Sequence, residues 1–252
     1  MLADVKTVTA LGAYASGVLT AVTVQDAQAV HEVQAIDPLL VERQLQCVLR
    51  DIGADAIKLG MLGSRMTLEL VTRVCEAEAR HVPIVLDPVL ESSTGAALLE
   101  ESALLPLVQR LLPRVALVTP NVPEATRLTG VSIESAADLS RAADALLCLG
   151  AGAVLLKGGH LPGEQVVDLL RTADGYQREF EAPRVERQAR GTGCTLASAV
   201  AAGLAEGMTL EGAVQQAEDF VQQALNHPAQ VPSARPPLFH AFGQLKVPAA
   251  RA

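Results

Sequence analysis

The sequence has few aromatic residues and no long apolar run. Aromatic residues make up 2% of the 252 residues and tryptophan is absent, so a base-stacking platform for nucleic acid is not expected. A net charge of −8 argues against a general nucleic-acid or membrane-surface binder, because either would need a basic face. No stretch approaches the roughly 18 apolar residues of a membrane span, and the N-terminus has no signal-peptide layout. We therefore expect a cytoplasmic protein that binds neither nucleic acid nor membrane.

Cysteines are also few, and the four present form no C-x-x-C pair. This spacing suggests neither a zinc site nor a disulfide framework. Cys47, Cys75 and Cys148 lie in helix-like segments, and we expect them to be small buried hydrophobic residues. Cys194 differs because it directly follows the stretch "GTG" at 191–193.

Short β-branched runs alternate with longer helical patterns along the chain. This alternation is typical of an α/β protein with a mostly parallel central sheet flanked by helices on both faces, and the near-continuous apolarity of the runs favours strands that are covered on both faces. We expect all 252 residues to form one domain around a sizeable core. The expected strands cover 17–24, 56–60, 83–88, 115–120 and 153–159.

Helix starts and one hairpin can also be predicted. N-cap residues at Asp37, Ser64 and Ser135 precede helical patterns, the first with Pro38 at the first helical position. Two alternating runs around Asp174-Gly175 indicate an antiparallel hairpin, and two helices at 193–206 and 210–225 follow it.

Ligands of such sheets bind beyond the carboxyl ends of the strands, and candidate residues follow the expected strands there. The sequence "GTGC" at 191–194 places a glycine turn at a helix N-terminus, which suits an anion; a plain loop-to-helix turn with a buried cysteine fits equally. Lys157 ends a strand before two glycines, where its ammonium can reach a nucleotide phosphate or lie solvated in a loop.

Carboxylates complete the set at this edge. Asn121 and Glu124 have the spacing of a helix N-cap and its partner three residues on, and the same spacing suits a hydrated Mg²⁺ with its phosphates. Asp87 is either a turn residue or a carboxylate that needs a partner. Together these features indicate phosphoryl transfer from a Mg-nucleotide. The pattern G-x-x-x-x-G-K-[ST] is absent, which excludes a P-loop enzyme.

Seven collinear segments of the chain resemble the hydroxymethylpyrimidine (phosphate) kinases of thiamine biosynthesis, a ribokinase-like family: "ADVKTVTALGAY", "TAVTVQDAQAV", "IKLGML", "VLDPVL", "LVTPNVPEA", "AVLLKGGH" and "GTGCT". The resemblance implies a ribokinase-like fold and a homodimer. It also implies that ATP, with Mg²⁺, phosphorylates 4-amino-5-hydroxymethyl-2-methylpyrimidine and then its monophosphate.

The resemblance also implies roles for individual residues. Asp4 and Gln25 would hydrogen-bond the aminopyrimidine, Met61 and Val89 would pack against its ring, and Asp87 would lie on the substrate side. Lys157 would contact ATP phosphates, Asn121 and Glu124 would lie near phosphate and Mg²⁺, and Gly191, Thr192, Gly193 and Cys194 would form the anion hole.

Cys194 has two possible roles. A thiol has an unperturbed pKa of about 8.5 that a helix N-terminus can lower, so Cys194 could accept the hydroxyl proton as a thiolate. It could instead act through the N–H groups of its loop. We favour the base.

The chain departs from the family at two places. The family begins with a further strand and a glycine-rich loop, whereas here Met1 falls just before "ADVKT"; a sheet without that strand would leave backbone groups unpaired. The second departure is Arg190, which either contacts substrate phosphate or is a solvated loop arginine.

Two other functions stay open from the sequence. A pyridoxal or pyridoxine kinase would share the cysteine loop and bind a similar aromatic ring. A nucleotide-binding variant with impaired catalysis is the alternative from another class.

Overall fold

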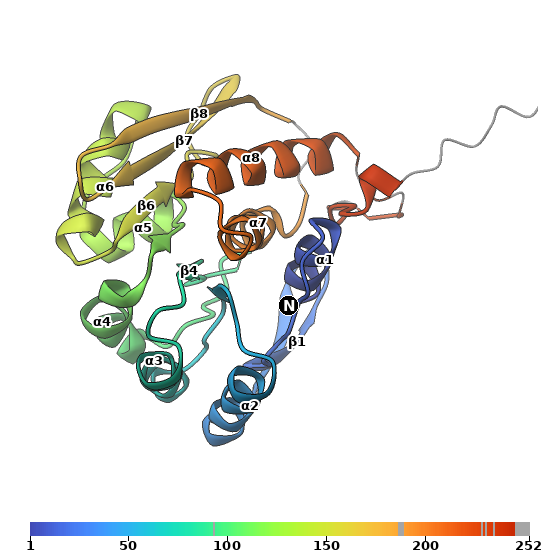
Figure 1. Ribbon diagram of the computed structural model, residues 1–252. Coiled ribbons are helices and arrows are strands. Elements are labelled where there is room, and N and C mark those ends of the chain that lie inside the picture. Colours follow the sequence, from blue (N-terminus) through green and yellow to red (C-terminus); the bar gives the residue numbers. More distant parts are fainter. Residues whose placement is uncertain (93, 186–188, 228, 230, 234, 245–252) are drawn as a thin grey trace, which may run out of the picture.

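The computed structural model describes residues 1–92, 94–185, 189–227, 229, 231–233 and 235–244. This part of the chain holds a six-stranded sheet with helices on both faces, and beside it a separate two-stranded sheet (Figure 1). No helix among these residues is long and apolar enough to cross a membrane.

The strands are β1 Ala21–Gln25, β2 Val30–Ala35, β3 Ile57–Leu59, β4 Ile84–Leu86, β5 Leu117–Val118, β6 Ala153–Leu156, β7 Gln165–Thr172 and β8 Gln177–Pro183. The helices are α1 Leu2–Ala10, α2 Pro38–Asp51, α3 Arg65–Glu78, α4 Leu104–Pro106, α5 Val122–Thr129, α6 Leu139–Cys148, α7 Thr192–Ala205 and α8 Leu210–Asn226. Short 3₁₀ and π turns extend α4 over residues 101–114.

The larger sheet has the strand order β3-β4-β5-β6-β7-β8. Its first four strands are parallel to one another, β7 runs antiparallel to β6, and β8 runs antiparallel to β7. The predicted mostly parallel sheet is confirmed, as is the hairpin around Asp174-Gly175, where Gly175 has a φ of 90°. Because β3 to β6 run in one direction, their carboxyl ends meet at one edge.

Each face of this sheet has its own apolar core. Within β4, Ile84 and Leu86 pack with residues of α2, α3, α5 and α6, whereas Val85 between them packs with α7 and α8. This alternation follows from the two-residue period of a strand. Since both faces are covered, the three residues of β4 are almost fully buried.

The helix starts agree with the predicted caps. The Asp37 side chain accepts from Leu39 N with Pro38 at the first helical position, and Ser64 accepts from Thr67 N. Ser135 caps a single 3₁₀ turn that leads into α6. Local hydrogen bonding therefore sets these boundaries.

The strand predicted at 17–24 is wrong in both extent and environment. The observed β1 begins at Ala21, pairs antiparallel with β2, and β2 was not predicted. Val22, Val24 and Val33 of this hairpin are 52%, 54% and 41% exposed. An apolar run did not mean burial here because β1 and β2 form a sheet of their own, and these three valines belong to neither apolar core of the larger sheet.

The prediction for the cysteines is confirmed for Cys75, which is buried, and wrong for Cys47 and Cys148, which are exposed. Both exposed thiols lie on amphipathic helices. Cys47 is two positions after the buried Leu45 of α2, and Cys148 is two positions after the buried Leu146 of α6. Two residues are about 200° around a helix, so these thiols face solvent.

Candidate active site

A buried ion pair joins the ends of two strands in the larger sheet. Asp87 follows β4 and Lys157 follows β6; Lys157 Nζ donates to Asp87 Oδ1 at 3.1 Å, and the two side chains are 4% and 14% exposed. Gly193, in the first turn of α7, lies directly against both. A Cβ at this position would be 3.1 Å from Lys157 Nζ and 3.9 Å from each Asp87 carboxylate oxygen. The missing side chain at 193 therefore lets the helix N-terminus approach the pair.

A second buried lysine, Lys58 of β3, was missed by the sequence analysis. Its Nζ donates to Asp4 Oδ1 at 3.0 Å, and Ser198 Oγ of α7 donates to the same oxygen at 2.7 Å. The Met1 amino group lies 2.8 Å from Asp4 Oδ2. A lysine inside the apolar stretch "AIKLG" was the available signal, because a charge in a buried strand requires a partner.

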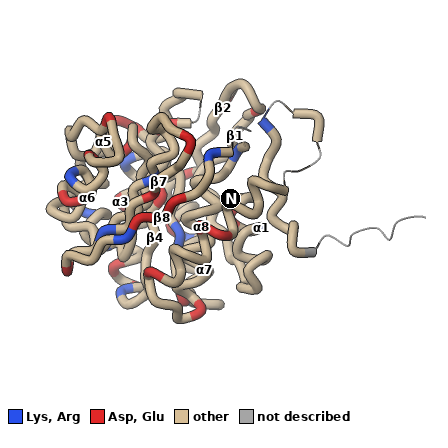
Figure 2. The backbone as a smooth tube through the Cα atoms, turned by 90° about the horizontal axis from the view of Figure 1, so that it is seen from above, with Lys and Arg blue, Asp and Glu red and all other residues tan. Residues whose placement is uncertain are grey.

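Charges at this edge compensate one another. Burial opposes the charge of Lys58, but its anionic neighbours, among them the Asp87 and Asp4 carboxylates, outweigh burial and raise its pKa. Burial would also raise the pKa of Asp87, yet Lys157 and Lys58 together hold that pKa below its usual value. Asp87 is thus a buried carboxylate between two ammonium groups. Lys and Arg are interspersed with Asp and Glu along the rest of the chain (Figure 2).

The surroundings of Cys194 favour a neutral thiol. Burial raises its pKa to about 11; Asp87 and Asp4 add to the effect and Lys58 opposes it. The Asp87 carboxylate is near enough to the thiol for its negative charge to oppose ionisation of Cys194. The expected thiolate is therefore disfavoured, because burial and two carboxylates exceed what a helix N-terminus can supply.

Asn121 and Glu124 form the cap that their spacing predicts. Asn121 N donates to Glu124 Oε2 at 2.8 Å and Glu124 N donates to Asn121 Oδ1 at 2.9 Å, while an isolated bridge sets Asn121 beside Lys157. Burial raises the pKa of Glu124 to about 7, opposed by Lys157 and assisted by Asp87. Such a carboxyl gains from a nearby cation, so the site fits Mg²⁺.

No cluster of three acidic, histidine or cysteine ligands occurs among the described residues. Mg²⁺ commonly takes one or two carboxylates and completes its shell with phosphates and water. A single buried carboxyl at this edge therefore suits a cation that arrives with a nucleotide.

The other expected residues divide into two groups. Met61 follows β3 and Val89 follows Asp87 by two residues, so both lie at the same edge as the cluster. Gln25 is exposed at the end of β1, and Arg190 Nε donates to Arg235 O at 3.2 Å. Among the described residues, no hydrogen bond or ion pair joins Gln25 or Arg190 to the lysine-carboxylate cluster.

Gly191 and Thr192 begin α7 as expected. Gly191 is the residue before the helix and has a φ of 87°, in the left-handed region, where glycine has no steric cost. The turn places the start of α7 next to the strand ends, because a Cβ on Gly193 would lie 3.1 Å from Lys157 Nζ.

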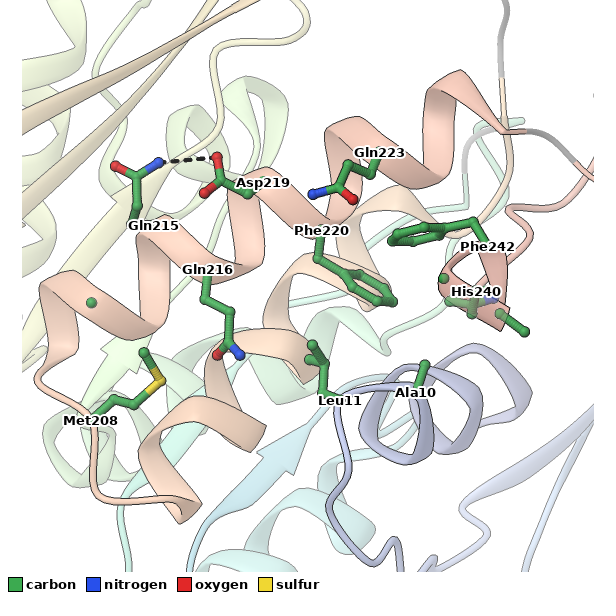
Figure 3. A pocket seen from close by; sticks show the side chains of 13 residues that line it. Ala10, Leu11, Met208, Gln215, Gln216, Asp219, Phe220, Gln223, His240 and Phe242 are labelled. Carbon is green, nitrogen blue, oxygen red and sulfur yellow. Dashed lines mark hydrogen bonds between the residues drawn. The ribbon is translucent and has the colours of Figure 1, made fainter. Parts of the chain in front are cut away.

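A hollow of about 620 Å³ lies elsewhere, between α1, α8 and the segment 240–243 (Figure 3). Its lining includes Leu11, Phe220 and His240 but none of the lysines and carboxylates described above. His240 Nε2 and Thr195 Oγ1 are 2.9 Å apart, so this segment is tied to α7. We do not assign the hollow to the candidate site.

A buried lysine after β6, set against a helix N-terminus that begins with glycine, and a second buried lysine within β3 define an α/β protein suited to handling phosphate groups. Comparison with known proteins agrees and is more specific. Residues 1–238 match the family model described as phosphomethylpyrimidine kinase. The chain belongs to the phosphomethylpyrimidine kinase family, which confirms the resemblance inferred from its seven segments.

Individual relatives and solved structures support this assignment. The chain is 46% identical over 226 residues to the hydroxymethylpyrimidine/phosphomethylpyrimidine kinase of Streptomyces coelicolor, which covers 88% of this chain and 82% of that protein. The phosphomethylpyrimidine kinase structure from Clostridium difficile 630 has a TM-score of 0.77 at 32% identity, covering 88% of this chain and 91% of that one. The ADP complex of Bacillus subtilis pyridoxal kinase has a TM-score of 0.87 at 28% identity, covering 97% and 92%. The ribokinase-like fold is thereby confirmed.

One relative is much longer than this chain. The chain is 42% identical over 224 residues to the thiamine biosynthesis bifunctional protein ThiED of Geobacter sulfurreducens, and the match covers 88% of this chain but only 45% of that protein.

Proposed function

We propose that residues 1–252 act as one kinase domain that transfers the γ-phosphoryl group of ATP to 4-amino-5-hydroxymethyl-2-methylpyrimidine and then to its monophosphate. The observation that carries the proposal is the buried Asp87–Lys157 pair against Gly193 at the N-terminus of α7. Family membership supplies the substrate, because the relatives are named for it. By analogy with the family, we further propose a cytoplasmic homodimer.

The transferred group would lie between Lys157 and the first turn of α7. A loose phosphoryl-transfer transition state gains chiefly from positioning and from fixed positive charge. Lys157 would contact ATP phosphates, and the N–H groups of Gly191, Thr192, Gly193 and Cys194 would receive the oxygens of the transferred group. Both supports are buried at one edge, so they need little rearrangement during the reaction.

For the hydroxyl proton we propose Asp87 as the acceptor in place of Cys194. Lys157 and Lys58 keep Asp87 ionised, whereas the pKa of Cys194 is raised to about 11 by burial. Cys194 would then donate a hydrogen bond that orients Asp87 and contribute its backbone N–H to the anion hole. The proton passes from the substrate hydroxyl to the Asp87 carboxylate as the new P–O bond forms.

Glu124 and Asn121 would hold Mg²⁺ near the phosphates. When bound, Mg²⁺ neutralises phosphate charge. Glu124 suits this place because its buried carboxyl, with a pKa raised to about 7, gains a counter-charge there. Arg190 would add a phosphate contact through the guanidinium nitrogens that do not bind Arg235.

The aminopyrimidine would bind beside α1. Burial opposes the charge of Asp4, but Lys58 and the Met1 amino group lower its pKa to about 2, so it can accept hydrogen bonds from the substrate amino group. Gln25 would bond the ring from β1, and Met61 and Val89 would cover its faces. Lys58 is the group that keeps Asp4 charged.

A pyridoxal kinase activity is the second candidate, because pyridoxal kinase structures match over 95–97% of the chain. The test is a comparison of kcat/KM for the aminopyrimidine and for pyridoxal, with ATP and Mg²⁺ saturating. We expect the aminopyrimidine to be preferred by at least about tenfold, the effect of roughly 1.4 kcal/mol in transition-state binding. Preference for pyridoxal would reverse the substrate assignment.

A further inference from the structure

A pair of buried acids lies behind the turn that carries Lys157. Asp168 of β7 is 8% exposed, and its Oδ1 accepts a hydrogen bond from Gly158 N at 2.8 Å. Gly158 follows Lys157 directly in the chain. The carboxylate therefore holds the backbone of the turn from which Lys157 reaches the candidate site.

The turn has little freedom to move away from β7. A Cβ on Gly158 would lie 2.1 Å from Val167 O, so the glycine backbone rests directly on the strand. On the outer side, Arg184 Nη1 donates to Gly159 O at 2.9 Å. Asp168 is the inner support of the same turn, and the Gly158 hydrogen bond requires it to act as an acceptor.

Glu218 of α8 faces Asp168 across the sheet-helix interface. Glu218 Oε1 is buried and has no hydrogen-bond partner among the described residues, and Asp168 is near enough for its negative charge to act on Glu218. Burial raises the pKa of both acids, and the Asp168 carboxylate raises that of Glu218 further. The Gly158 N–H favours an ionised Asp168, so Glu218 is the member of the pair that favours a proton.

Few other charges act on this pair. Lys157 at the end of β6 favours the carboxylates, and Asp219 of α8 adds negative charge near Glu218. From β8, Arg178 is bonded to Glu211 and Gln215 of α8.

The ion pair toward α6 belongs to the other side of the sheet. Arg171 of β7 bonds Asp144 of α6, and residue 171 is an odd number of positions from Asp168, which puts it on the opposite face of the strand. Burial and the negative charges of Asp168 and Asp219 favour a protonated Glu218, and Lys157 opposes them.

We propose that Asp168 is a positioning residue for the Lys157–Gly158–Gly159 turn and that the proton on Glu218 maintains it. The proposal rests on the kinase function above. Loss of this proton at alkaline pH creates two adjacent buried carboxylates. Their repulsion shifts Asp168 from Gly158 and loosens the turn that carries Lys157, so the affinity for ATP falls.

Steady-state kinetics from pH 6.5 to 9.5 tests this with four variants. Asp168→Ala should raise KM for ATP about tenfold, the typical cost of a lost buried hydrogen bond, and should change kcat less. Asp168→Asn should keep most of the affinity for ATP, because its amide oxygen can accept the hydrogen bond from Gly158 N. In wild type, KM for ATP should rise at alkaline pH. Glu218→Gln should abolish that rise.

Asp219→Asn is the matched control for Glu218→Gln. It removes one negative charge from the next position of α8, where Asp219 accepts from Gln215 (Figure 3), and should keep the alkaline rise in KM. An Asp168→Ala protein that melts normally with an unchanged KM for ATP would overturn the positioning role. A rise in KM for ATP at alkaline pH that persists in Glu218→Gln would overturn the role of the proton on Glu218.

Hydrogen exchange separates this inference from the function itself. Amide exchange in the peptide containing 157–163 should be faster in Asp168→Ala than in wild type. After correction for intrinsic rates, raising the pH should speed this exchange more in wild type than in Glu218→Gln. This outcome is expected even if no substrate is phosphorylated, so a failed activity assay alone would not contradict the role of Asp168 and Glu218. A monovalent-cation requirement that Glu218→Gln abolishes would instead show a bound cation and contradict the proton.

Discussion

Asp87 and Asp168 are both buried at the same edge of the sheet, yet their surroundings are opposite. Asp87 lies near Lys157 and Lys58 and is held ionised, whereas Asp168 lies near the buried acid Glu218, on which we place a proton. The comparison shows two ways to keep a carboxylate inside a protein: a cation beside it, or a proton on its neighbour. The first leaves charge available to a substrate, and the second supports a backbone turn.

The comparison is tested most severely by removing the charge of Asp87. Asp87→Asn keeps the shape but leaves Lys157 and Lys58 without their common counter-charge and removes the proposed proton acceptor. We expect kcat to fall by about 10²–10³, as for other groups that act on the transition state, measured as ADP release at saturating substrate. The control is Asp144→Asn, which breaks the half-exposed pair with Arg171 and should leave kcat within about twofold.

A folded Asp87→Asn protein with kcat within tenfold of wild type would mean that Asp87 is structural. The contrast with Asp168 would then lose its functional meaning.

Lys58→Met tests the other side of the Asp87 region. Removing one member of a buried charge cluster typically costs about 3–5 kcal/mol, and here it leaves Asp4 and Asp87 with less positive charge. Urea unfolding at pH 7 should show a loss of about 3 kcal/mol, compared with less than about 0.5 kcal/mol for the exposed Lys6→Met. Equal stabilities of the two variants would show that Lys58 does not hold the carboxylates.

The pH dependence of stability tests the Asp168 region. The folded-state pKa of Glu218 is raised above that of the unfolded chain by burial and Asp168, so the folded state retains a proton that the unfolded state has lost. Stability from this group is therefore full below the unfolded pKa, near 4.3, and declines as pH rises toward the folded value. Glu218→Gln should flatten the decline, by at most about 1.4 kcal/mol per pH unit.

Urea unfolding between pH 5 and 9 gives the free energy of unfolding of wild type and of Glu218→Gln. If both depend on pH in the same way, Glu218 does not hold the proton that we place on it. Asp219→Asn serves again as the control and should follow wild type.

Cys194→Ser should have the smallest effect. Since the thiol is neutral beside an ionised Asp87, a hydroxyl can replace its hydrogen bond, and the backbone N–H of residue 194 remains. We expect kcat to fall less than about tenfold, below the usual 10²–10⁴ contribution of a general base. A larger loss, together with a shift in the alkaline limb of the kcat profile, would return the role of base to Cys194.

The sequence predicted the parts of this protein that depend on neighbours in the chain. The caps at Asp37 and Ser64 and the Asn121–Glu124 pair involve residues two or three positions apart, and all were found. The positions of Asp87 and Lys157 also followed, because residues after parallel strands share an edge.

What the sequence did not predict depends on distant partners. Lys58 is paired with Asp4, which is 54 residues away in the sequence. Glu218 of α8 is influenced by Asp168 of β7. The hairpin of β1 and β2 was missed because an apolar run indicates a strand but not which strand will cover it. The neutral state of Cys194 likewise needed the burial and the carboxylates that only the fold brings together.

Phosphorus NMR of the purified chain with Mg-ATP and the aminopyrimidine tests the central claim most directly. The account predicts ADP together with the pyrimidine monophosphate, followed by the diphosphate, and neither product with Asp87→Asn over the same time. Binding of both substrates without phosphorylated pyrimidine, and with ADP only at the level of a reaction lacking the pyrimidine, would contradict the account.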